Sequence, residues 1–206
     1  MVDINDWYDL RGIEDDLAAD YVLQADLTRD TAGYDEVATS FTPITGGFTG
    51  SLDGNGYVIR NLTIDSTSGY SGSYTGLFDT NSGTIQNISL TGTLVSGTFK
   101  SGPLAGFHGG TIESCVVNMD VTASNAEIGG LVGENGSGAT TTNCYALGSV
   151  EGSEKVAGFA GVNRGTIQTS YSVGSVNATT GTAEHGFTGE VFENTETDCY
   201  WDTESS

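Results

Sequence analysis

The sequence predicts an all-β protein, a right-handed parallel β-helix (β-solenoid) with coils of about 27 residues and a short N-terminal capping helix. Three observations predict this fold. A pattern of apolar and polar residues recurs at a nearly constant interval, and the apolar residues inside each unit alternate with a period near two. No helical period appears between residues 41 and 183. Each unit is long enough for about three short strands with turns, so successive units can stack strand on strand.

The first 40 residues are expected to form the N-terminal cap and the first coil. Apolar residues spaced three to four apart follow Asn5 or Asp6, either of which can cap a short amphipathic helix. These apolar residues are Ile4, Trp7, Leu10, Ile13 and Leu17. A charged helix at this end would cover the unpaired strand edges and the open apolar core of the first coil.

The stacked coils are predicted over residues 41–183. Four units align on an apolar residue that is followed four positions later by a polar turn residue. The apolar residues are Leu77, Leu104, Leu131 and Phe159, and the turn residues are Asn81, His108, Asn135 and Asn163. The second halves align on Ile88, Cys115, Cys144 and Ser170. An earlier unit fits when Ile59, Leu62 and Ile64 are matched to Ile85, Ile88 and Leu90.

Residues 184–206 are expected to close the other end, so residues 1–206 form a single domain. The chain has 27 acidic and 6 basic residues, a net charge of −21. Eleven acids lie in residues 1–36 and seven in residues 184–206, which fits charged caps that discourage end-to-end association. Adaptation to high salt is the alternative explanation. Either way, the charge argues against nucleic acid and anionic lipid surfaces as partners.

The sequence also indicates where the protein is located in or outside the cell. No apolar run reaches about 18 residues, so we expect no membrane insertion in this segment. Three cysteines are too few for a disulfide scaffold in a chain of 206 residues. Met1 opens directly into an acidic segment without a signal peptide. We expect one segment of a larger secreted or cell-surface protein, whose signal and anchor lie elsewhere.

The repeated residues resemble the GLUG motif. The resemblance is carried by residues 129–135, 143–150, 157–167 and 170–176, with a lead-in at 48–64 and an ending at 199–202. Proteins of this family are large secreted surface proteins, adhesin-like proteins and non-catalytic parts of some secreted peptidases. The resemblance therefore implies an extracellular β-solenoid without shared catalytic residues. The unit at Leu104 departs from the motif, with Pro103 and His108 where Gly and Asn are usual.

The sequence predicts no catalytic residues, no metal site and no cofactor. It holds no nucleophile motif, phosphate loop or zinc spacing. His108 is expected to serve in a turn and His185 in a loop, and Asp53–Gly56 is expected to form a tight turn rather than a calcium loop. The aligned outward positions hold a single acid, so they offer no carboxylate pair. These positions are Thr93, Asp120, Ser149 and Ser175.

Tyr145 and Tyr171 are the candidate ligand-binding residues. If Cys144 and Ala146 face inward, both tyrosines form an exposed strip with Leu147 and Val173. A one-residue slip would place them in the core instead. A third option is that Tyr200 and Trp201 fold back over them.

Two further questions stay open at this stage. Cys115 and Cys144 fall at equivalent places in adjacent coils, where they form either a reduced ladder in the core or a disulfide. Four sequons begin at Asn61, Asn87, Asn135 and Asn177, and Asn61, Asn87 and Asn143 align with one another. These asparagines serve either in an amide ladder inside a turn or as glycan acceptors.

These observations predict a non-catalytic structural or adhesive module, a rigid scaffold that makes many weak contacts along its length. Surface glycans or other proteins are the expected partners. The alternative is a carbohydrate-binding or carbohydrate-active (polysaccharide-degrading) β-helix, in which Tyr145 and Tyr171 contact sugar rings.

Overall fold

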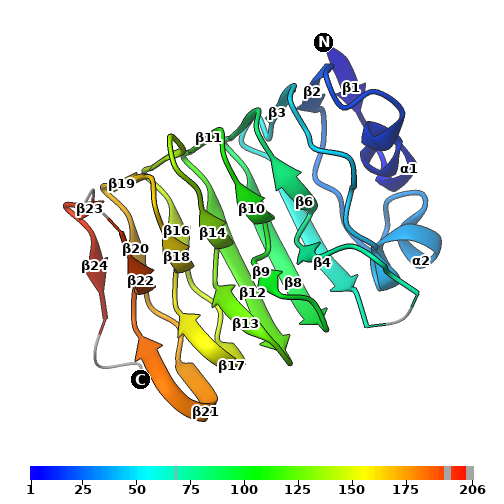
Figure 1. Cartoon of the computed structure of the whole chain (residues 1–206). Helices are drawn as coiled ribbons and strands as arrows, with labels where there is room; N and C mark the ends of the chain where they lie inside the picture. Colours follow the sequence, from blue (N-terminus) through cyan, green and yellow to red (C-terminus); the bar gives the residue numbers. More distant parts are fainter. Residues whose placement is uncertain (68, 193–195, 203–206) are drawn as a thin grey trace.

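The chain winds into a parallel β-solenoid of about six turns in the computed structural model, which describes residues 1–67, 69–192 and 196–202 (Figure 1). Equivalent residues of successive coils are Leu52, Ile85, Ile112, Thr141 and Ile167. They follow at steps of 33, 27, 29 and 26 residues. All strand pairings between the described residues are parallel, so the predicted stacked architecture is confirmed.

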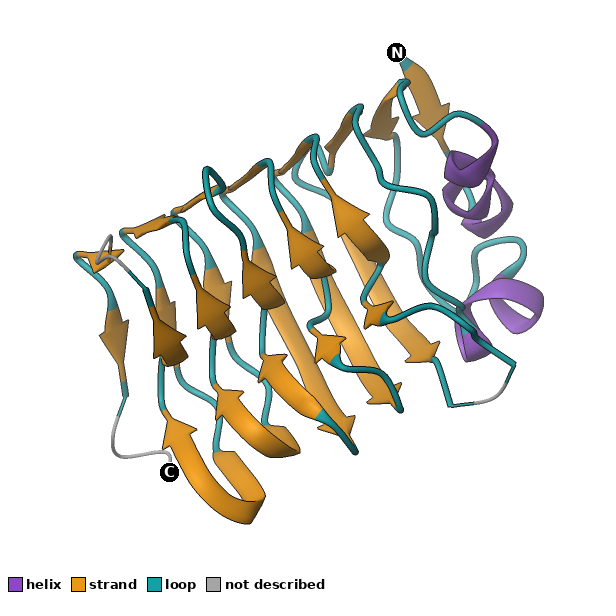
Figure 2. Ribbon diagram, in the orientation of Figure 1, coloured by secondary structure: helices purple, strands orange, loops and turns teal. Residues whose placement is uncertain are grey.

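The described strands form three sheets, one for each side of the coil (Figure 2). The first sheet consists of very short strands that run along one edge of the molecule. Its members are β1 (Val2–Ile4), β2 (Asp20–Leu23), β3 (Ser51–Asp53), β7 (Thr84–Gln86), β11 (Thr111–Glu113), β15 (Thr140–Thr142), β19 (Thr166–Gln168) and β23 (Glu196–Thr197).

The second sheet contains the longest strands. Its long members are β4 (Val58–Asp65), β8 (Ser89–Ser96), β12 (Val116–Ala123), β17 (Val150–Ala157) and β21 (Val176–His185). Its short members are β5 (Tyr74–Thr75), β9 (Lys100–Ser101), β13 (Ala126–Gly129), β16 (Tyr145–Ala146), β20 (Tyr171–Ser172) and β24 (Tyr200–Trp201). The third sheet comprises β6 (Phe78–Asn81), β10 (Ala105–His108), β14 (Val132–Asn135), β18 (Ala160–Asn163) and β22 (Thr188–Val191).

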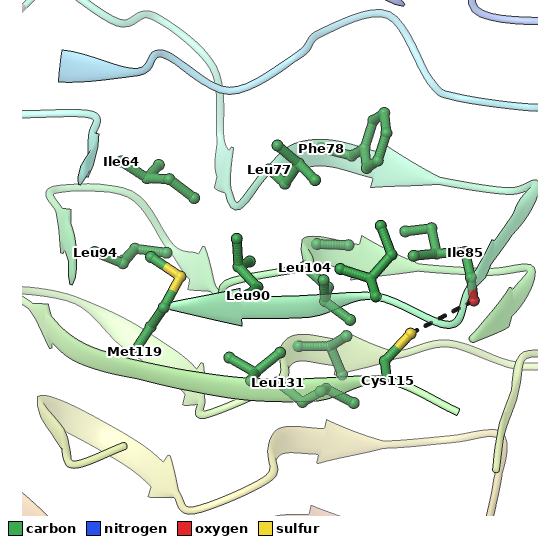
Figure 3. Close-up of a cluster of buried hydrophobic side chains, with 14 of the residues drawn as sticks. Ile64, Leu77, Phe78, Ile85, Leu90, Leu94, Leu104, Cys115, Met119 and Leu131 are labelled. Carbon is green, nitrogen blue, oxygen red and sulfur yellow. Dashed lines mark hydrogen bonds between the residues drawn. The ribbon is translucent and has the colours of Figure 1, made fainter. Parts of the chain in front are cut away.

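Columns of like residues fill the interior between the sheets. Leu77, Leu104, Leu131 and Phe159 are fully buried at equivalent positions, as the repeat predicts. Figure 3 shows Leu77, Leu104 and Leu131 stacked from one coil to the next. Burial of a leucine-sized side chain contributes roughly 1.5–3 kcal/mol, so the columns supply the main stabilisation of the stack.

The N-terminal end is closed by a helix, as expected, but the helix is shorter than the apolar spacing predicts. Asp6 caps α1 (Trp7–Arg11) by accepting a hydrogen bond from the Asp9 N–H at 2.9 Å. A 3-10 turn, η1 (Gly12–Asp15), follows. Ile4 instead belongs to β1, because it pairs with Leu23 of the first coil. The second helical segment comprises α2 (Tyr34–Val37) and η2 (Ala38–Ser40).

The alignment of the earliest unit is wrong in register. Leu52, not Ile59, lies beside Ile85, and Ile59 pairs with Leu90. This coil is longer than the later ones because it includes the turn at residues 54–57 and an additional loop after residue 65. A fixed 27-residue step therefore does not extend into the first coils.

No helix in the described part of the chain is both long enough and apolar enough to cross a membrane.

Candidate functional site

The two candidate tyrosines lie on the outer face of the second sheet. Tyr145 pairs with Tyr171, while the neighbouring Cys144 and Ala146 are fully buried. Tyr145 is half-buried and Tyr171 is 38% exposed. The register is therefore the outward one, and the one-residue slip is wrong.

The tyrosine column extends to the last coil. Tyr200 of β24 pairs with Tyr171, so it continues the column instead of folding back over it. The rings of Tyr145 and Tyr171 are 4.4 Å apart with an interplanar angle of 39°. These two rings therefore pack against each other and partly cover one another. The face of Tyr200, which is 67% exposed, is the most open surface of the column.

Trp201 contacts the last coil rather than the tyrosines. A Cβ atom at Gly186 would lie 1.5 Å from the indole ring, so the ring packs directly against the Gly186 backbone. The proposed third role of Trp201, as a cover for Tyr145 and Tyr171, is therefore wrong.

The corner between the second and third sheets depends on glycine. The motif residue Gly133 lies in β14, and a Cβ there would lie 2.6 Å from both the Ser101 nitrogen and the Gly106 oxygen. Both obstacles are backbone atoms, which cannot move aside. The repeated glycine thus lets one strand cross another at this corner, and its role is structural.

A cluster of six charged side chains lies beside this corner. It brings together three of the six basic residues of the chain with three glutamates. Its members are Lys100, Glu127, Glu134, Lys155, Arg164 and Glu190. The Lys100 Nζ pairs with Glu134 and lies 3.5 Å from a Glu127 oxygen. The Arg164 Nε donates to Glu134 at 3.1 Å. The cluster links four successive coils through their side chains.

Three members of the cluster are largely buried, whereas Lys155, Arg164 and Glu190 are 35–40% exposed. The side chains of Glu127 and Glu134 are 9% and 7% exposed, and that of Lys100 is 15% exposed. Burial alone lowers the pKa of Lys100, but the hydrogen bond and charge of Glu134 outweigh it and raise the pKa above its usual value. Lys100 also lies 5.4 Å from the ring centroids of Tyr74 and Phe107. Each of these two carboxylates is therefore neutralised by cations rather than presented to a ligand.

The turn residues form a buried polar ladder. Asn81, His108, Asn135 and Asn163 are fully buried in register with one another. The Asn135 Nδ2 donates to Asn163 Oδ1 at 2.8 Å, and Asn163 Oδ1 also accepts from the Gly165 N–H. Repeated asparagine therefore satisfies buried backbone and side-chain groups together.

His108 is a neutral member of this ladder. Asn81 Nδ2 can only donate, so its contact at 3.1 Å requires that His108 Nδ1 accept. The proton then lies on Nε2, which is 3.4 Å from the Thr140 carbonyl oxygen. Burial lowers the pKa of His108 to about 4. The predicted turn role of His108 is confirmed, because its Nδ1 also lies 3.4 Å from the Gly110 N–H that donates to it. The expected loop position of His185 is wrong, because this exposed residue ends β21 and pairs with Ala157.

The cysteines occupy one interior column. Cys115 and Cys144 are free thiols in adjacent coils, and the Cys115 Sγ lies 3.8 Å from the Ile85 carbonyl oxygen (Figure 3). Burial raises the pKa of Cys144 well above its ordinary value. The structure thus shows the reduced ladder of the two alternatives. Cys199 joins the same column two coils later, beyond Ser170, which the sequence alignment missed.

The Asp53–Gly56 segment is a tight turn. Asn55 has a positive φ of 51°, and its N–H donates to Asp53 Oδ1 at 2.8 Å. Burial opposes ionisation of Asp53, but hydrogen bonds from Asn87, Asn55 and Gln86 outweigh it and lower its pKa. The carboxylate therefore joins two coils. In the described ranges, no group of three or more His, Cys, Asp and Glu side chains is arranged to hold a metal ion.

The sequons differ in their surroundings. Asn135 is fully buried in the polar ladder, whereas Asn87 and Asn177 are exposed. Asn87 and Asn143 occupy the same corner with φ of 53° and 54°, as predicted. Asn61 is not equivalent to them, because it lies at a bulge opposite the segment Leu90–Gly92.

Comparison with known proteins places this geometry in a family. The model of the GLUG motif matches residues 124–151, the stretch that contains Gly133 and Asn135. Residues 124–151 therefore carry a GLUG motif. The chain is 35% identical over 127 residues to halomucin of Haloquadratum walsbyi, a match that covers 59% of this chain. The chain spans about 1% of the length of that relative.

A solved structure has a similar fold. It is described as the structure of a "putative immunoglobulin A1 protease" from Bacteroides ovatus and matches with a TM-score of 0.57 and 17% identity. The match covers 96% of this chain and 74% of the other. At this identity the likeness concerns the fold alone.

The sequence reasoning found the tyrosine column and missed the ion cluster. It sought carboxylates in the row of Asp120, whereas Glu134 lies in a different outward column, beside Phe107. The Gly-Glu-Asn segment at residues 133–135 was the available signal, since its Asn is inward and its Glu must therefore face outward.

Proposed function

We propose that this GLUG-repeat chain is a non-catalytic structural and adhesive module of a secreted or cell-surface protein. The parallel stacking of its coils carries the proposal, because backbone ladders and side-chain columns that recur from coil to coil make a stiff support for repeated weak contacts. The similarity to a short portion of halomucin supports a role as one module of a very long protein.

The neutralised charges of the cluster also support a non-catalytic role. A glycosidase needs one carboxyl group that donates a proton and a second that accepts a proton or attacks. Glu127 and Glu134 both lie beside Lys100, and Glu134 additionally accepts from Arg164. An arrangement of this kind favours stability over proton transfer.

Sugar binding at the tyrosine column is the second candidate function. Tyr171 and Tyr200 are exposed on the outer face, and aromatic rings of this kind can contact the apolar faces of sugars. The mutual stacking of Tyr145 and Tyr171 leaves the end of the column at Tyr200 as its most accessible ring face.

The test compares monomeric and multivalent protein on a glycan array, together with an assay for released reducing ends. We expect beads that carry many copies to be retained while the monomer binds weakly, with no release of reducing ends. Release of reducing ends by the purified protein would overturn the non-catalytic role. Tight monomer binding that a Tyr171→Ala, Tyr200→Ala double variant abolishes would favour the sugar-binding alternative.

The acidic surface is open to a separate test. Adaptation to high salt predicts that the melting temperature rises with sodium chloride, because screening reduces repulsion among 27 acidic residues. A melting temperature that does not change with salt would leave charged end caps as the explanation.

A further inference from the structure

A small hollow lies where the first coil leaves the stack. Leu27 bridges to Ile59 and Phe41 to Ile64, but the chain between them departs from β4 to form α2 and η2 (Figure 1). The hollow left beside β4 has a volume of about 250 Å³. It is lined by Arg29, Tyr34, Asn61, Thr63, Thr91, Gly92 and Thr93.

The backbone around this hollow is irregular. The register of β4 against β8 shifts between Ile59 and Leu62, so Asn61 bulges with a φ of 62°. Its N–H donates to the Thr91 Oγ1 at 3.3 Å instead of to a ladder carbonyl. Gly92 has a φ of 150°, and a Cβ there would lie 1.9 Å from the Leu62 oxygen. Bulges of this kind redirect side chains and are frequent beside active sites.

Arg29 is the cation of this hollow. The five other basic residues form ion pairs with Asp or Glu. Arg29 forms no ion pair within the part of the chain that the structure describes, and its side chain is exposed at the hollow. A guanidinium without a carboxylate partner is available to an anionic ligand.

Hydroxyls and an aromatic ring complete the lining. The side-chain hydroxyls of Thr63 and Thr93 make no hydrogen bond to any other described residue. The Tyr34 hydroxyl donates to the Asn61 carbonyl oxygen at 3.3 Å, which fixes the ring at the wall. One cation, two hydroxyls and one aromatic ring therefore line the same hollow.

We propose that this hollow binds a carboxylate-bearing sugar residue, a uronic acid. The Arg29 guanidinium would pair with the carboxylate, and Thr63 and Thr93 would exchange hydrogen bonds with the sugar hydroxyls. Sites for drug-sized ligands occupy roughly 300–1,000 Å³, so this smaller hollow suits a single ring. The net charge of −21 opposes an anion at long range, but the Debye length falls to about 3 Å at 1 M salt, which leaves the direct contact.

The test is an NMR titration of the full chain with glucuronate, glucose and acetate in separate experiments. We expect glucuronate to shift the backbone amides of Thr91, Gly92 and Thr93 at concentrations where glucose and acetate have little effect. Equal shifts with acetate would overturn the assignment to a sugar, and equal shifts with glucose would overturn the role of the carboxylate. No shift with glucuronate would overturn the site.

Matched variants locate the contact. Arg29→Gln should weaken glucuronate binding by at least about tenfold, the loss expected for a charge-assisted hydrogen bond. Arg60→Gln removes the same charge from an arginine paired with Asp26 and should retain binding. Thr93→Val, which keeps the side-chain shape, should weaken binding less than Arg29→Gln. Unchanged affinity in Arg29→Gln would overturn the proposal, whatever the outcome for the structural role of the solenoid.

Discussion

The regular coils and the first coils of this solenoid are built differently. From Leu77 onward, like residues recur in columns and each coil pairs with the next through ladders in all three sheets. In the first coils, ladders persist in the first sheet, but single bridges such as Leu27 to Ile59 replace them in the other two. Unique contacts such as the Trp7 Nε1 bond to the Thr28 carbonyl oxygen close the end. Repetition therefore supplies stability in the regular coils, whereas the interruption of the repeat leaves room for a distinct hollow.

The largest expected effect concerns the motif glycine of the regular coils. Gly133→Val should destabilise the protein by about 4 kcal/mol or more, because its Cβ would collide with the backbone of Ser101 and Gly106. The free energy of unfolding from urea denaturation measures this loss.

A glycine of the N-terminal cap provides the control. Gly12 has a φ of −63°, and a Cβ added there would meet no other atom within 4 Å. Gly12→Ala should therefore change stability by less than about 1 kcal/mol and in the stabilising direction. Equal losses in the two variants would contradict the special role of the motif corner.

The second expected effect concerns the ion cluster. Glu134→Gln removes the carboxylate shared by Lys100 and Arg164 and leaves the largely buried Lys100 beside the Glu127 carboxylate, 3.5 Å away. An uncompensated buried charge costs about 3–5 kcal/mol, so with Glu127 still present the loss should approach but not exceed that range. Urea denaturation is again the suitable measurement, because guanidinium would itself screen the charges.

The first coils offer an exposed pair for comparison. Arg60 and Asp26 are separated by 3.7 Å, with side chains 50% and 42% exposed. Arg60→Gln should therefore cost no more than about 1 kcal/mol. If it costs as much as Glu134→Gln, burial is not what distinguishes the cluster.

The third expected effect is a loss of stability at acidic pH that is caused by His108. The pKa of His108 is about 4 in the folded protein against 6.5 when unfolded, so below pH 6.5 the unfolded chain binds a proton that the folded chain rejects. Stability should fall by about 3 kcal/mol between pH 6.5 and pH 4 from this residue.

His108→Asn isolates this effect, because asparagine occupies the equivalent place in the neighbouring coils. As the pH falls from 6.5 to 4, the free energy of unfolding of the variant should rise steadily relative to that of the wild type. Denaturation curves of both proteins at each pH measure this difference. A difference between the two proteins that does not vary with pH would rule out a buried neutral histidine.

The repeat pattern predicted the columns but not the surroundings of the site. Leu77, Leu104 and Leu131 could be aligned because stacking places like residues over like at each coil. The cluster around Lys100 could not, because Glu134 reaches it across a corner whose path depends on Gly133. The Arg29 hollow was missed because it lies where the repeat is interrupted.

The sequence by itself determined that the chain is a stack of short strands, that like residues recur at each regular coil, and that a short capping helix follows Asn5 or Asp6. The tertiary structure alone decided the register of the first coils, the partners of Lys100 and the hollow beside β4. The physical reason is that period-two burial is a local property of a strand, whereas corners, bulges and ion pairs depend on how distant segments approach one another.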